Sequence, residues 1–155
     1  MTRRVLAVAS ASFALAALGC GGRGAPPPAD LDTRNETCAS CRMPVSDPRL
    51  AAQIAGIDEL PAFFDDLGCL RERLDGRAAG PREAIYVADH LSGAWIPAEK
   101  AVYTRCPGLA TPMGSGLVAH ADAASRDRDP ATRGGVPVTI AEALGLKPGA
   151  GGATR

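Results

Sequence analysis

The chain has 155 residues, and its 17 lysines and arginines balance its 17 aspartates and glutamates, so the formal net charge is zero. It has no basic patch and only 4% of its residues are aromatic, which argues against a nucleic-acid partner. The segment that can fold, residues 37–147, is long enough for one small domain or two small subdomains.

The chain begins with a pattern typical of protein export. Arg3 and Arg4 precede an apolar run, Val5–Leu18, which has the length of a signal-peptide core and is too short to cross a bilayer. We therefore expect residues 1–19 to be a signal peptide. Its removal takes away two arginines and leaves a mildly acidic chain, with 15 basic against 17 acidic residues.

The end of this segment, Ala17-Leu18-Gly19-Cys20, resembles a lipobox, although leucine is usual where Ala17 stands. We expect a lipid on Cys20; the alternative is ordinary cleavage nearby that leaves Cys20 as a plain thiol. Residues 20–36, rich in proline, glycine and alanine, predict a stiff tether. The expected location is the cell envelope, with the protein lipid-anchored to a membrane and facing the periplasm. Residues 148–155 are expected to be a disordered tail.

In the first half of the domain, Arg49–Ile57 predicts a strand and Pro61 predicts the start of a helix. Asp65 and Asp66 would lie in its first turns, where carboxylates suit the helix dipole. The buried stripe of this helix would be Phe63, Leu67, Leu70 and Leu74, with Gly76 as the stop. Further extended segments are expected at Ala84–Asp89 and from Trp95.

The second half repeats this order. Strands are expected at Ala101–Tyr103, Leu117–Ala119 and Val136–Val138, with a weak helix at Ala121–Arg128. Thr139–Glu142 looks like a capping box that opens a last helical turn. Strand, helix and strand therefore follow one another twice, which predicts an α+β fold.

The segment that carries chemistry is Cys38-Ala39-Ser40-Cys41-Arg42-Met43. Two thiolates at i and i+3, with a thioether two residues later, can converge on one ion, and such soft ligands select copper(I). The Cys-x-x-Cys pair alone also fits a zinc half-site, a redox pair or a disulfide. Zinc would need two more ligands and is not usually bound by thioether, and Pro44 favours a loop over the helix of a thioredoxin-like pair.

The positions of the methionines favour a copper(I) site over the other interpretations of the Cys-x-x-Cys pair. Apart from the initiator, the chain has only Met43 and Met113, and neither lies in an apolar helical stripe, where a gap-filling methionine is expected. Met113 lies in the turn-rich loop Thr111–Gly116. We interpret the two methionines as ligands; the alternative is that a loop methionine fills a small core.

These residues resemble the NosL family, the copper-binding accessory lipoproteins of nitrous oxide reductase. The likeness rests on four motifs in one order: Cys38-x-x-Cys41-x-Met43, Phe64–Leu70, Tyr86–Asp89 with Trp95, and Thr111–Gly114 with Leu117–Ala119. It implies a fold of two ββαβ units related to the organomercurial lyase MerB. It also implies delivery of copper(I) to the reductase with an ABC transporter complex. By matching position, the metal ligands would be Cys41, Met43 and Met113, with Cys38 as a further one.

The chain departs from that family pattern at two positions. Arg42 stands where glycine is usual, and His120 stands where phenylalanine is usual. His120, and Cys106 near the Met113 loop, are candidates to extend the site or change its metal preference, although a lone histidine at a strand end is more often a surface or satisfied residue. Cys69 is interpreted as a buried thiol and His90 as a turn residue.

The predicted function is that of a copper(I) chaperone for nitrous oxide reductase or another exported cuproprotein, and not of an enzyme. A thiol-disulfide oxidoreductase that uses Cys38 and Cys41 is one alternative. A MerB-like enzyme would cleave a carbon–metal bond with an aspartate as proton donor, but Asp65 and Asp66 belong to a helix start and need not face Cys41. A purely structural role, with disulfides such as Cys38–Cys41, is the remaining alternative.

Overall fold

The structure is a computed structural model that describes residues 24–56 and 59–146. The expected signal peptide, the lipidation of Cys20 and the C-terminal tail lie outside the described residues. Among the residues that are described, no helix has both the length and the apolar character needed to span a membrane.

The first sheet has four antiparallel strands in the order β2-β1-β3-β4. Its strands are β1 (Ala52–Gly56), β2 (Ala62–Phe64), β3 (Glu83–Ala88) and β4 (Trp95–Pro97), and helix α1 (Leu67–Leu74) connects β2 to β3. A single turn of 3-10 helix, η1 (Ala98–Lys100), leads from this sheet to the next.

The second sheet has three antiparallel strands in the order β6-β5-β7. Its elements are β5 (Val102–Arg105), β6 (Leu117–His120), helix α2 (Ala123–Arg128), the 3-10 turn η2 (Pro130–Thr132) and β7 (Val136–Val138), followed by helix α3 (Ile140–Leu144). The strands expected from sequence in this half are therefore confirmed. Thr139 and Glu142 form the expected capping box of α3.

The two halves have the same topology. β1-β2-α1-β3 and β5-β6-α2-β7 each place the first strand in the middle of the sheet, so the predicted α+β fold is confirmed and is compatible with two ββαβ units. In both units the helix begins three residues after the second strand ends. An aspartate N-cap holds each start: Asp66 accepts from the Gly68 N–H and Asp122 from the Ser125 N–H.

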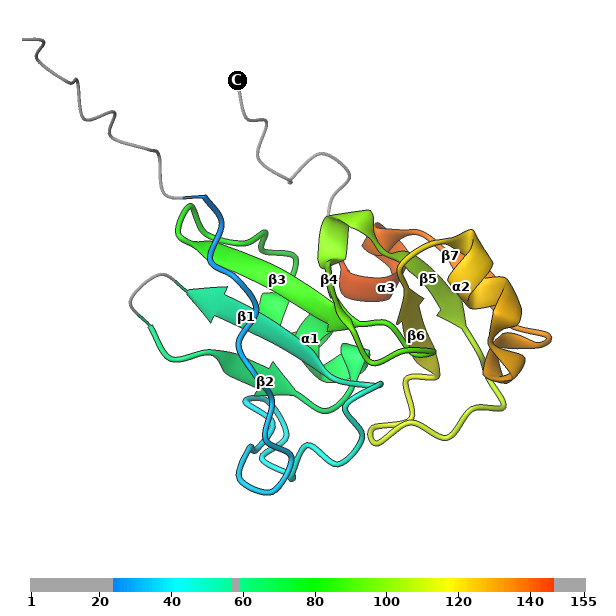
Figure 1. Ribbon diagram of the computed structural model, residues 1–155, viewed down its shortest axis with the longest axis horizontal. Coiled ribbons are helices and arrows are strands. Elements are labelled where there is room, and N and C mark those ends of the chain that lie inside the picture. The colour runs from blue at the N-terminus through cyan, green and yellow to red at the C-terminus, as the bar shows by residue number, and fades with distance from the viewer. Residues whose placement is uncertain (1–23, 57–58, 147–155) are drawn as a thin grey trace, which may run out of the picture.

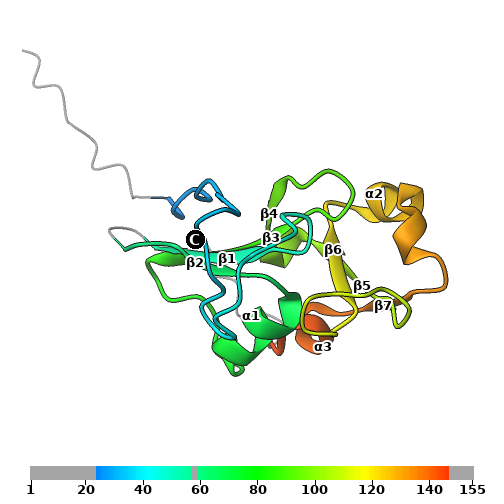
Figure 2. The ribbon, with the colours of Figure 1, turned by 90° about the horizontal axis from the view of Figure 1, so that it is seen from below.

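The sheets lie side by side, and α1 and α3 cover the same face of the molecule (Figures 1 and 2). A single main core takes side chains from both sheets and from these two helices. Its largest fully buried side chains include Phe64, Leu70, Leu74, Leu117 and Leu144. An isolated parallel bridge between Asp89 and Ala119 joins the end of β3 to β6. The two units are thus held together by both a shared core and a backbone contact.

The helix expected from Pro61 begins later, at Leu67. The residues between belong to β2, where Phe63 pairs with Gln53 of β1. Successive side chains of a strand point to opposite faces, so Phe64 enters the main core while Phe63 packs in a separate cluster with Trp95. The rest of the predicted stripe is confirmed, because the three leucines of α1 are buried.

Part of the expected tether lies against the domain. The Tyr86 hydroxyl donates to the Pro26 carbonyl at 2.7 Å, and the buried Gln53 side chain exchanges two hydrogen bonds with the backbone of Ala29. Ala29 and Leu31 pack on the Phe63 cluster. Figure 2 shows this N-terminal segment, in blue, on the face of the sheet opposite to α1.

Candidate metal centre

The Cys38–Met43 segment forms a closed loop. The Cys38 N–H donates to the Met43 carbonyl at 2.8 Å, and the Arg42 N–H donates to the Cys38 carbonyl at 3.0 Å. The closure requires a left-handed backbone at Arg42, with φ of 67°. Glycine adopts that conformation without steric cost, which gives a physical reason for the glycine expected there and makes Arg42 a strained substitute.

This loop is fastened to the end of β2, since the Ala39 N–H donates to the Phe63 carbonyl at 2.8 Å. Three cysteine sulfurs and a carboxylate oxygen, all within 4.8 Å of one another, meet at this point. We call this group the sulfur cluster; it consists of Cys38, Cys41, Asp65 and Cys69. The four cysteines of the described chain are all free thiols, so the Cys38–Cys41 disulfide that was an alternative is absent from the structure.

Asp65 faces Cys41, contrary to the sequence-based expectation. The Cys41 sulfur lies 3.5 Å from Oδ1 and 3.7 Å from Oδ2 of this aspartate. The expectation was wrong because Asp65 is not inside a helix. It follows β2 directly and precedes the cap residue Asp66, so its side chain turns toward the loop that β2 holds.

Burial keeps protons on two of the thiols. Burial raises the pKa of Cys41, an effect that the Met43 N–H opposes and the Cys38 side chain adds to. Burial and the neighbouring Cys38 side chain also raise the pKa of Cys69 strongly. A metal ion that binds here therefore displaces protons, and the thiols are weak nucleophiles without it.

The two methionines are not core residues. Met43 is 44% exposed and Met113 is 48% exposed, which rules out the alternative in which they fill a core. The Met113 N–H and the Thr111 hydroxyl both donate to Oδ2 of Asp66, at 3.0 and 2.7 Å. Because Asp66 adjoins Asp65, the Met113 loop is held at the helix start that carries the sulfur cluster.

These hydrogen bonds keep Asp66 ionised. Its burial works toward a higher pKa, but the bonds from Ser115, Thr111 and the backbone of Gly68 and Met113 outweigh burial, and the pKa falls below its usual value. One carboxylate therefore caps α1 and ties down the Met113 loop at the same time.

The other two cysteines differ in their positions. Cys69, interpreted from sequence as a buried thiol, is buried and also belongs to the sulfur cluster. Cys106 packs with Leu50 and Val118 in a different apolar cluster and is not a member of it. Helical spacing could not reveal the role of Cys69, because the face of α1 that it occupies is covered by a distant loop.

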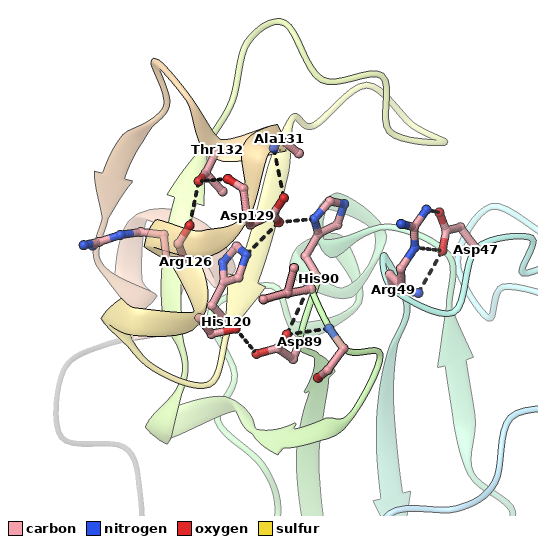
Figure 3. Close-up of polar contacts among 12 residues, drawn as sticks. Asp47, Arg49, Asp89, His90, His120, Arg126, Asp129, Ala131 and Thr132 are labelled. Atoms are coloured by element: carbon pink, nitrogen blue, oxygen red, sulfur yellow. Dashed lines mark hydrogen bonds and ion pairs between the residues drawn. The ribbon is translucent and has the colours of Figure 1, made fainter.

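A second group was missed at the sequence level. His90, in the turn after β3, and His120, at the end of β6, both contact Asp129, which follows α2 (Figure 3). Nδ1 of His90 lies 2.5 Å and Nε2 of His120 lies 2.9 Å from the same oxygen, Oδ2. We call these three residues the histidine cluster. His120, named from sequence as a candidate to extend the sulfur site, lies in this separate group instead, and no spacing in the sequence links its three segments.

Comparison with known proteins gives no match: no family model, no curated protein and no solved structure matches this chain. The resemblance to the NosL family therefore rests on the motifs alone, and function has to be argued from the geometry of the two clusters.

Proposed function

We propose that this chain is a copper(I) carrier of the cell envelope. Copper(I) is its cargo, bound by cysteine sulfur of the sulfur cluster together with Met43 and Met113, and it has no catalytic role. The observation that carries the proposal is the convergence of three thiols within 4.8 Å, at a helix start to which the loop of an exposed methionine is tied.

The donor set favours a soft monovalent ion. Thiolate and thioether suit copper(I), whereas magnesium and calcium prefer oxygen and structural zinc is rarely bound by thioether. The two most buried thiols, Cys38 and Cys69, are 0% and 1% exposed, while Cys41 is half-buried. Copper would enter and leave on the side of Cys41 and the methionines, where a partner can add its own soft ligand and take the ion by exchange.

The wider setting rests on the resemblance and the sequence pattern. The chain would be exported, anchored through lipid on Cys20, and would deliver copper to nitrous oxide reductase or another exported cuproprotein with an ABC transporter complex. A tether whose last part, near Pro26 and Ala29, is fixed to the domain would also set the orientation of the sulfur cluster relative to the membrane.

The test is a copper(I) titration of reduced protein under anaerobic conditions against a colorimetric copper(I) chelator. We expect one equivalent per chain, and a loss of roughly a thousandfold in affinity for Cys41→Ser. Cys106→Ser is the matched control, because it removes a buried thiol outside the sulfur cluster and should bind like the wild type. Failure of the wild type to take up stoichiometric copper(I) would refute the carrier role.

One observation keeps a second candidate open. The contact between Cys41 and Asp65 provides the pair that a MerB-like enzyme needs. In that reaction Cys41 would bind R–Hg⁺ through sulfur and give its proton to Asp65, the carbon–mercury bond would break as Asp65 passes this proton to carbon to give R–H, and the thiolates would keep Hg²⁺. Incubation with phenylmercury and assay for benzene tests this; release of benzene that is lost in Asp65→Asn would replace the carrier proposal.

The thiol-disulfide oxidoreductase alternative is less favoured, because burial raises the pKa of Cys41 and a reactive thiol needs a low one. It predicts insulin reduction that depends on Cys38 and Cys41 and is indifferent to Met113.

A further inference from the structure

The histidine cluster contains every histidine of the chain, since the sequence has only two. Its members come from three segments that are distant in sequence: the turn after β3, the end of β6 and the end of α2. Their exposed fractions are 8% for His90, 0% for His120 and 5% for Asp129. Two imidazoles and a carboxylate have thus been removed from water together, at a cost that their contacts with one another offset.

Both rings are directed at a single point. Oδ2 of Asp129 receives both ring nitrogens, although its Oδ1 is occupied only by the backbone N–H of Ala131 at 2.9 Å. The two rings meet at an angle of 68°, with centroids 6.1 Å apart. In Figure 3 they lie on two sides of the carboxylate, and both ring nitrogens point at it.

The distances are close to those of a metal site. The three atoms lie within 4.8 Å of one another. Ligand atoms about 2.0–2.1 Å from a tetrahedral zinc ion lie about 3.3 Å apart. The two nitrogen–oxygen contacts of 2.5 and 2.9 Å would each need to open by less than about 1 Å, a change within the reach of side-chain rotation.

Metal binding would change the hydrogen-bond pattern of the cluster. Without an ion, Nδ1 of His90 and Nε2 of His120 both contact Asp129, and the buried Nδ1 of His120 has no partner. With an ion, Nδ1 of His90 and Nε2 of His120 bind through their lone pairs, and the protons move to the opposite ring nitrogens. For His120 that move breaks no existing hydrogen bond at Nδ1, but it leaves a buried N–H without an acceptor, a cost that the metal–nitrogen bond has to exceed.

We propose that the histidine cluster is a second metal site, which takes a borderline divalent cation such as Zn²⁺ through His90 Nδ1, His120 Nε2 and Asp129 Oδ2. Two imidazoles and one carboxylate form a donor set that zinc accepts, with a fourth position left for water or another ligand. The nearby Asp47 and Arg49 pair with each other at 2.8 Å and add little net charge. This proposal does not depend on the copper proposal, because it uses none of the sulfur ligands.

The test follows the imidazole nitrogens by NMR during titration with ZnCl₂. With only two histidines, the readout reports on this site alone, whatever binds at the sulfur cluster. We expect both rings to change tautomer with one equivalent bound at this site: His90 from Nδ1–H to Nε2–H, and His120 from Nε2–H to Nδ1–H. Tautomers that stay unchanged at saturating zinc would show a closed hydrogen-bonded triad and overturn the proposal.

Two variants separate ligation from structural support. His90→Asn and His120→Gln place an amide N–H near the position of the ring N–H, so each can still donate to Asp129 but cannot replace the imidazole ligand. We expect at least a tenfold loss of zinc affinity at this site, measured on the remaining histidine, with unchanged backbone spectra of the zinc-free protein. Asp127→Asn, an exposed aspartate of α2, is the control. Wild-type zinc affinity in both histidine variants would overturn the proposal.

Discussion

The sulfur cluster and the histidine cluster each take a residue from the point where the second strand of a ββαβ unit ends, although His90 of the histidine cluster comes from the turn after β3 in the first unit. In the first unit β2 ends at Phe64 and is followed by Asp65 and the capped helix α1; in the second, β6 ends at His120 and is followed by the capped helix α2. The backbone frame is shared, but one cluster offers sulfur and the other nitrogen and oxygen. The backbone of the strand end and the capped helix therefore determines where a cluster can form, and the side chains determine which ligand atoms it offers.

The clusters also differ in access. Beside the sulfur cluster stand Met43 and Met113, which are 44% and 48% exposed, whereas no member of the histidine cluster exceeds 8%. A buried thiol group with exposed thioethers beside it suits transfer of an ion to a partner, and a site whose members are all buried suits retention. We therefore expect fast exchange at the first site and slow exchange at the second.

The largest effect is expected at the junction between the two units, because a substitution there disturbs both of them. Asp89 accepts four hydrogen bonds: from the N–H groups of Leu91 and Ser92 on one oxygen, and from the Ala121 N–H and the Ser125 hydroxyl on the other. Asp89→Asn would turn an amide group toward two donors, and we expect a loss of about 3 kcal/mol in the free energy of unfolding. Urea denaturation measures it, with Asp127→Asn as control; a loss below about 1 kcal/mol would contradict this account.

Acid should weaken the same junction. Burial opposes ionisation of Asp89, but the hydrogen bonds from Ala121, Ser92 and Ser125 prevail and lower its pKa to about 2. Because the folded-state pKa is lowered, the stabilisation is present above the unfolded value near pH 4 and is lost as the pH falls toward 2. The expected loss from this group is about 2 kcal/mol. Urea unfolding at both pH values tests it, and a smaller pH dependence in Asp89→Asn is required.

A change at Met113, a proposed copper ligand beside the sulfur cluster, should affect the copper site and leave the histidine cluster unchanged. Met113→Leu conserves size but removes the thioether, and we expect copper(I) affinity to fall about tenfold, or about 1.4 kcal/mol. Zinc binding at the histidine cluster should not change. Chelator competition measures the first and histidine NMR the second; unaltered copper(I) affinity would remove Met113 from the ligands.

The smallest effect concerns the loop of the sulfur cluster. Arg42→Gly relieves a left-handed residue at φ of 67°, and the gain is offset in part by the entropy of glycine in the unfolded chain. We expect a net stabilisation of about 0.5 kcal/mol, measured by thermal unfolding. Asp75→Gly, at the left-handed end of α1, is the parallel case in the same unit. Destabilisation by Arg42→Gly would show that the arginine side chain contributes contacts of its own.

Local signals in the sequence were enough for most of the fold. The capping box at Thr139 and the β-branched run before Asp89 depend on neighbouring residues, and both were predicted. The start of α1 was misplaced because Phe63 fits a helical stripe with Leu67 and Leu70 as well as it fits a strand. Pairing of β2 with β1 decided the matter, and pairing is a tertiary property.

The candidate sites were predictable to the extent that their residues are close in sequence. Cys38 and Cys41 lie on one loop, and their spacing indicated that their sulfurs could converge, as they do. Ligation by Met43, on the same loop, stays a prediction. Asp65 was predicted to lie inside a helix because the start of α1 was placed too early. Cys69 was correctly predicted to be buried, but its position beside Cys38 and Cys41 was not predicted. The histidine cluster could not be found, because two strand ends and a helix end meet only after the two units have packed together.

The central claim is that a soft ion selects the sulfur cluster and leaves the histidine cluster empty. X-ray absorption spectroscopy at the copper edge of protein loaded anaerobically with one equivalent of copper(I) tests it most directly. The account predicts a coordination shell of sulfur alone, with no imidazole scattering. A shell that contains imidazole nitrogen would contradict it, because both imidazoles of the chain belong to the histidine cluster.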